Sequence, residues 1–119
     1  MFRAGDVVVF ESPDVRGPKR RPGVVISSDL YHENRPDVIV ALVTIQTVRA
    51  IGPTDCILLD WAEAGLRRPS ACRAFINTRP LNLVSRIGRL TDRDWQGVCQ
   101  TVNRALSLND VAAPDTEDE

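Results

Sequence analysis

Short apolar runs rich in valine and isoleucine alternate with polar turns along most of the chain. Runs of this kind, bounded by glycine, proline and aspartate, are typical of β-strands. The longest run, Val38–Ile45, shows no alternation of apolar and polar residues, which predicts a strand buried on both faces. The predicted strands are Asp6–Phe10, Gly23–Ser27, Val38–Ile45, Asp55–Asp60, Ser70–Thr78 and Ile87–Leu90.

Two polar segments connect the first three predicted strands. Ser12–Pro22 contains three prolines, one glycine and four basic residues. Because proline removes a backbone donor and bends the path, we predict a loop there. Tyr31–Asp37 ends in Arg-Pro-Asp and is either a connection or one short helical turn.

A helical period occurs near the C-terminal end of the chain. Its apolar residues recur at spacings that place them on one side of a helix facing a core. Thr91 occupies the N-cap position and Asp94 the position of the acid in a capping box, so we predict a helix beginning at Thr91. The apolar stripe consists of Trp95, Val98, Cys99, Val102 and Leu106. Several short strands followed by one helix predict a small β-barrel or curved sheet with helical cover.

The net charge of −1 conceals an uneven distribution. Residues 110–119 carry five acids and no base, so we predict one domain over residues 1–109 and a disordered acidic tail over 110–119. Without that tail the chain has fifteen basic and eleven acidic residues, a net charge of +4. Fourteen of the fifteen basic residues are arginine, whose planar fork suits phosphate. The excess of arginine over lysine is also consistent with a genome that favours arginine codons.

Composition argues against a metal site, a disulfide framework and a membrane location. The three cysteines are scattered and His32 is the single histidine, so we expect buried reduced thiols, no metal and no cofactor. The sequence has no apolar stretch long enough to span a membrane and no apolar signal region at its N-terminus. We therefore expect a cytoplasmic protein with no membrane partner.

Arginine and hydroxyl side chains lie at the ends of two predicted neighbouring strands. Arg21 precedes the second strand and Thr44 ends the third, a pair suited to holding a phosphodiester. Taken alone, Arg21 is also consistent with a solvated turn and Thr44 with an ordinary strand residue. Two basic clusters could bind RNA on either side of this pair, and the alternative is two solvated loops. The RNA-binding candidates are Arg16, Lys19, Arg20, Gln46, Arg68, Ser70 and Arg73, with Arg67 beside them.

The order of these segments resembles that of the MazF/PemK toxin family over about residues 5–106. No single motif is specific, but their order and spacing together are. The matching segments are Gly5-Asp6, Arg21-Pro22, Ser28-Asp29 with Tyr31, Ile39–Thr44 with Gln46, Gly65-Leu66 with Ser70, and Ile87–Leu90.

This resemblance implies an SH3-like small β-barrel of the CcdB/MazF type with a C-terminal helix. It also implies a homodimer, a cognate antitoxin, and metal-independent cleavage of single-stranded RNA, with Arg21 and Thr44 as the catalytic residues. The chain departs from many family members in two places. The loop before Arg21 is shorter and contains no acid at the expected place, and Asn77–Pro80 stands where others have Arg-Thr-Ile-Asp.

Cleavage of RNA without a metal uses the ribose 2′-OH as the nucleophile, and it needs positive charge for the phosphorane. Arg21 would supply that charge and Thr44 would hold a phosphate oxygen, while DNA, which lacks the 2′-OH, would be spared. Two alternatives remain open from the sequence. One is a binding toxin of the same fold that inhibits a topoisomerase, as CcdB toxins do, and the other is a weakly catalytic member that binds RNA or its antitoxin.

Overall fold

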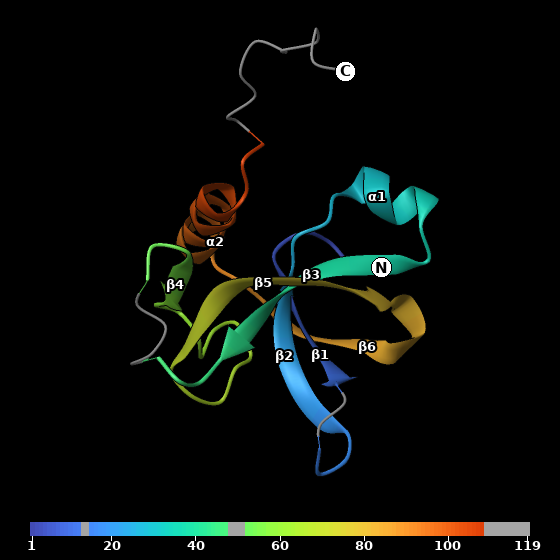
Figure 1. Ribbon diagram of the computed structural model, residues 1–119, viewed down its shortest axis with the longest axis horizontal. Coiled ribbons are helices and arrows are strands. Elements are labelled where there is room, and N and C mark those ends of the chain that lie inside the picture. Colours follow the sequence, from blue (N-terminus) through green and yellow to red (C-terminus); the bar gives the residue numbers. More distant parts are fainter. Residues whose placement is uncertain (13–14, 48–51, 109–119) are drawn as a thin grey trace, which may run out of the picture.

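An antiparallel sheet forms most of the protein in this computed structural model, which describes residues 1–12, 15–47 and 52–108 (Figure 1). The six strands lie in the order β4-β5-β3-β2-β1-β6. The strands are β1 (Asp6–Ser12), β2 (Lys19–Val25), β3 (Asp37–Thr44), β4 (Asp55–Leu58), β5 (Ser70–Pro80) and β6 (Val84–Arg89). The helical elements are α1 (Asp29–Asn34), the 3-10 turn η1 (Leu81–Leu83) and α2 (Asp92–Ala105).

Both faces of the central strands are buried, each in its own apolar cluster. We call the two sides of the sheet the Val7 face and the Phe10 face, after one residue of β1 in each cluster. Helix α2 covers the Val7 face, where its Val98 is fully buried. The Val7 cluster is formed by Val7, Val24, Ala41, Val43, Leu58, Ala64, Cys72, Leu90 and Val98. The Phe10 cluster is formed by Val8, Phe10, Val25, Val38, Val40 and Val84, with Phe2 and Leu42 packed against it.

These observations confirm the predicted fold class of a mainly antiparallel β-structure with a C-terminal helix. Strand β3 contributes Val38 and Val40 to one cluster and Ala41 and Val43 to the other, so it is buried on both faces, as its sequence predicted. The sheet order gives no pairing between β4 and β6 within the described residues, so closure into a barrel is not observed there.

The predicted loop over Ser12–Pro22 is wrong at both ends. Strand β1 continues to Ser12 and β2 already begins at Lys19, with Ser12 opposite Lys19 in the ladder. Pro22 is paired with Val9 of β1, whereas the ladder between β2 and β3 starts only at Gly23. Proline is tolerated here because this part of β2 has a strand neighbour on one side only.

The N-terminus of α2 is stabilised differently from the predicted capping box. Thr91 is the N-cap residue, but its hydroxyl makes no cap hydrogen bond and instead donates to Asp60 Oδ2 at 2.6 Å. The Asp94 carboxylate is buried and accepts from the backbone N–H groups of Leu59 (3.0 Å) and Asp60 (2.7 Å). These donors belong to the segment after β4. The Asp94 carboxylate therefore accepts hydrogen bonds from that segment and not from the backbone N–H groups at the start of its own helix.

Asp60 also forms a bidentate ion pair with Arg93, at 2.6 and 2.7 Å. The hydrogen bonds from Arg93, and then that from Thr91, lower the pKa of Asp60 from 3.8 to about 2. A carboxyl group with a lowered folded-state pKa stabilises the fold above its unfolded pKa, and the contribution is lost as the pH falls through the folded value. We therefore expect wild type to melt at a higher temperature than Asp60→Asn at pH 7, with the gap closing between about pH 4 and about pH 2. A gap in melting temperature that does not change with pH would contradict this role.

Four further sequence predictions concern the apolar stripe of the helix, the cysteines, a membrane span and the acidic tail. Trp95 and Val102 of the helical stripe pack against the Val7 cluster as expected, but Leu106 follows the end of α2 and is 40% exposed. Cys72 is buried, and burial raises the pKa of its thiol, whereas Cys56 and Cys99 are only partly buried. Within the described residues, no helix has the length and apolar character needed to cross a membrane. The predicted acidic tail lies outside the described residues.

Candidate functional site at the fork between two strands

Strands β2 and β3 are paired over only a short length and then separate. Their ladder joins Gly23 to Leu42, Val24 to Ala41 and Val25 to Val40. Before Gly23, β2 stays paired with β1, and beyond Leu42, β3 stays paired with β5. The two strands therefore diverge as the arms of a fork, which Figure 1 shows below the point where they meet.

Arg21 and Thr44 stand on the two arms of this fork. Each lies two residues beyond Gly23 and Leu42, the last pair of the β2–β3 ladder. Arg21 is the ladder partner of Phe10, and Thr44 follows Leu42 by two residues, so both side chains belong to the Phe10 face. Both residues are half-buried. The two predicted catalytic residues thus belong to one side of the sheet, on the two arms of the fork.

The Thr44 hydroxyl is held by the backbone that follows it. Its Oγ1 accepts from the backbone N–H of Gln46 at 3.1 Å. A hydroxyl can accept and donate at the same time, so the Thr44 O–H can still donate to an oxygen of a bound group.

A basic pocket of about 600 Å³ lies on the other side of the same fork. Pro22 and Ile45, the neighbours of Arg21 and Thr44, both line it. None of its lining residues is acidic, so its three arginines give it a positive potential. The lining residues are Val9, Arg20, Pro22, Ile45, Gly65, Leu66, Arg67, Arg68, Ser70 and Ile87.

This pocket gathers three of the predicted RNA-binding residues, Arg20, Arg68 and Ser70. Arg20 and Arg68 are exposed, whereas Ser70 is buried and its hydroxyl donates to the Arg68 carbonyl at 2.7 Å. Ser70 therefore shapes the turn that carries Arg68. Arg20 is adjacent to Arg21 in sequence but belongs to the opposite face, because side chains alternate along a strand.

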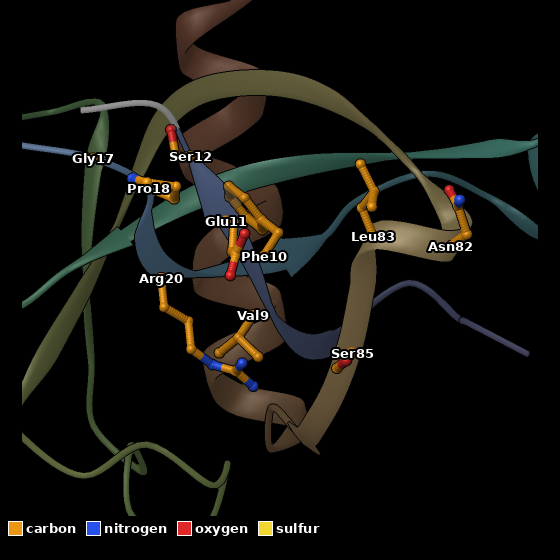
Figure 2. Close-up of a pocket in the computed structure, with 10 residues that line it drawn as sticks. All are labelled: Val9, Phe10, Glu11, Ser12, Gly17, Pro18, Arg20, Asn82, Leu83 and Ser85. Atoms are coloured by element: carbon orange, nitrogen blue, oxygen red, sulfur yellow. The ribbon is translucent and has the colours of Figure 1, made fainter. Parts of the chain in front are cut away.

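A second pocket, of about 580 Å³, adjoins the basic one and shares Val9 and Arg20 with it. Figure 2 shows the Arg20 side chain extending beside Val9, with Glu11 projecting from the neighbouring strand. Glu11 is the ladder partner of Arg20, so its carboxylate offsets part of the positive charge there. Glu11 was not among the predicted site residues, because its proximity to Arg20 depends on the register of β1 with β2.

The other candidate residues lie apart from the pocket. Arg73 on β5 pairs with Asp55 of β4, with Nε 3.4 Å from Oδ1, and Lys19 is exposed at the start of β2. Arg16 is exposed in the turn before β2, and Gln46 is exposed just beyond β3. Their roles in RNA binding remain predictions.

The fork between β2 and β3 thus presents arginine side chains, the Thr44 hydroxyl and a basic pocket. In the described part of the chain, no group of three or more His, Cys, Asp or Glu side chains is placed to hold a metal ion. Positioned cations and hydroxyl groups can bind a phosphodiester and stabilise negative charge that develops on it.

Comparison with solved structures gives the same fold in several toxins. An endoribonuclease in complex with its cognate antitoxin from a mycobacterial species aligns with a TM-score of 0.70 and 18% identity, over 96% of this chain and 100% of that chain. MazF in a MazE–MazF crystal structure from Deinococcus radiodurans aligns with a TM-score of 0.72 and 16% identity, over 89% and 96%. The Mycobacterium tuberculosis toxin MazF-mt6 gives 0.66 and 20%, over 82% and 93%.

Sequence comparison identifies the family directly. No curated protein sequence gives a significant match to the chain. Residues 3–106 match the family described as PemK-like, MazF-like toxin of type II toxin–antitoxin system. This match spans nearly all of the described residues and agrees with the resemblance of segment order. The chain belongs to the PemK-like, MazF-like toxins of type II toxin–antitoxin systems.

Proposed function

We propose that this toxin is a metal-independent endoribonuclease that cuts single-stranded RNA at the fork between β2 and β3. The observation that carries the proposal is that Arg21 and Thr44 both belong to the Phe10 face, each two residues beyond the last pair of the β2–β3 ladder. The relatives of the same fold include proteins described as endoribonucleases. A site built of arginine and threonine suits a reaction whose nucleophile comes from the substrate itself.

In the proposed reaction the ribose 2′-OH loses its proton to water as its oxygen attacks the adjacent phosphorus, and the bond to the 5′-oxygen of the next nucleotide breaks as that oxygen takes up a proton. Negative charge grows on the non-bridging oxygens of the phosphorane as the new bond forms. The Arg21 guanidinium would stabilise that charge, and the Thr44 hydroxyl would donate to a phosphate oxygen and fix its orientation. The products carry a 2′,3′-cyclic phosphate and a 5′-hydroxyl.

Backbone phosphates on the other side of the fork would be held by the basic pocket. Arg20, Arg67 and Arg68 line it together, and Pro22 and Ile45 connect it with the reacting pair. Single-stranded RNA is flexible, so one molecule can pass between the separated arms of the fork and contact both faces of the sheet. The remaining candidates, Arg16, Lys19, Gln46, Ser70 and Arg73, would extend or shape this path.

Two partners besides RNA belong to the proposal. Relatives of this fold have been crystallised with their antitoxins, so we propose a cognate antitoxin for this chain. We also propose a homodimer, for which light scattering after gel filtration is the direct measurement. A mass equal to that of one chain at micromolar concentration would exclude a stable dimer.

Replacing one ribose tests the chemistry without changing the protein. After the cut site is mapped on a long RNA, an oligonucleotide with a 2′-deoxyribose at that single position should resist cleavage while still binding. The same substitution one nucleotide away should leave cleavage unchanged. Cutting at the deoxy position would exclude attack by the 2′-OH. If a folded protein cuts no RNA at all, inhibition of a topoisomerase becomes the function to assay.

A further inference from the structure

Arg79 is a half-buried arginine stacked on a buried aromatic ring. Its Cζ lies 4.8 Å from the centroid of the Phe10 ring. Arg79 belongs to β5 and Phe10 to β1, and the sheet order puts β3 and β2 between these strands. The contact therefore crosses the Phe10 face, which the curvature of the sheet makes concave.

The Phe10 ring is fixed in place by the strand beneath it. Gly23 of β2 has no side chain, and a Cβ there would lie 3.1 Å from Phe10 Cε1 and 3.2 Å from the Ala41 carbonyl oxygen. The absence of that atom lets the ring lie close over the backbone. The buried, closely packed Phe10 ring thus supports Arg79.

Arg79 has no carboxylate partner among the residues that the structure describes, unlike five ion-paired arginines in the described chain. Its Nη1 donates to the Thr78 carbonyl at 3.3 Å, and its buried Nε has no acceptor in the described chain. Stacking on Phe10 compensates only part of the cost of removing a cation from water. The guanidinium therefore retains positive charge and hydrogen-bonding capacity for an anion.

The position of Arg79 connects it with the proposed reaction site. Phe10, on which Arg79 stacks, is the ladder partner of Arg21. Val38, the ladder partner of Arg79, belongs to the Phe10 cluster. Arg79, Arg21 and Thr44 thus share one face of the sheet, whereas the arginines of the basic pocket lie on the other.

We propose that Arg79 binds a backbone phosphate of the RNA next to the scissile one, with the Phe10 ring holding its guanidinium in place. This inference rests on the proposed function. A phosphate would supply the acceptors that the described chain does not provide, and a planar fork can bind two of its oxygens. Arg79 would then direct the strand along the Phe10 face towards Arg21 and Thr44.

The salt dependence of RNA binding tests this assignment. Each phosphate contact steepens the slope of log affinity against log salt by a similar amount. With a single-stranded oligonucleotide made uncleavable by one 2′-deoxyribose, the slope of log affinity against log salt should be smaller by about 0.7 for Arg79→Gln than for wild type. Arg35→Gln is the matched control, since Arg35 is exposed and pairs with Asp37 at 3.5 Å. Its slope should equal that of wild type.

The possible outcomes separate this inference from the proposed function. An Arg79→Gln slope equal to that of wild type overturns the inference alone. A wild-type protein that neither binds nor cuts RNA refutes the proposed function as well. If Arg79→Gln does not fold, Arg79→Lys decides, because lysine keeps the charge but loses the stacked planar fork. The inference then requires weaker RNA binding at an unchanged melting temperature, and an unchanged Kd overturns it.

Discussion

Replacing Arg21 by alanine should lower the single-turnover cleavage rate at saturating RNA by about 10²–10³-fold, the loss typical of removing one donor to a developing oxyanion. Arg21→Lys should fall between wild type and alanine, because lysine keeps the charge but not the planar fork. The measurement is the rate of cutting of a labelled oligonucleotide, with the melting temperature recorded for each variant.

Two further variants separate this effect from a general loss of positive charge. Arg20→Ala removes the neighbouring arginine from the opposite face, so it should weaken RNA binding and change the saturated rate little. Arg35→Ala removes an exposed arginine that pairs with Asp37 and lines neither of the two pockets, so it should change neither quantity. Cleavage by Arg21→Ala at the wild-type rate would show that the reaction does not depend on this residue.

Replacing Asp94 by alanine should destabilise the fold by about 2–4 kcal/mol, since two backbone donors would lose a charged acceptor. The donors are the N–H groups of Leu59 and Asp60, at 3.0 and 2.7 Å from the carboxylate, and the carboxyl side chain is buried. Asp94→Asn should cost less, because the amide keeps one acceptor oxygen. Urea or thermal unfolding measures these differences.

Asp92→Ala is the matched control for this effect. Asp92 also lies in the first turn of α2 but is exposed, so its loss should cost only a few tenths to about 1 kcal/mol through the helix dipole. Equal destabilisation by the two alanine variants would mean that Asp94 acts through the helix dipole and not through the segment after β4.

Strands and the helix were predictable because their apolar patterns are local. The run over Val38–Ile45 contains enough buried residues to predict a strand covered on both faces, and its observed counterpart is Asp37–Thr44. The error at Lys19–Pro22 arose because local propensity marks proline and basic residues as loop. Pairing with β1 overrides that propensity, and it depends on a ladder that composition does not reveal.

The position of the proposed catalytic pair was predictable only in part. Sequence order placed Arg21 and Thr44 near the ends of neighbouring strands, and the ladder puts each two residues beyond the last β2–β3 pair. The sequence could not show that Arg20 and Arg21 belong to opposite faces, since the strand boundary was placed after both. Arg79 was missed as a site residue because its significance depends on a contact with Phe10 across two intervening strands.

The central claim is metal-free cleavage of RNA by the pair at the fork, and analysis of the product ends in EDTA tests it most directly. A long single-stranded RNA should be cut by wild type to give 2′,3′-cyclic phosphate and 5′-hydroxyl ends. Arg21→Ala should lower the yield of both by about 10²–10³-fold. Thr44→Val, which keeps the strand-forming shape without the hydroxyl, should also lower it strongly. Cleavage that is unaffected by both substitutions, or the absence of cleavage by folded wild-type protein, would contradict the account.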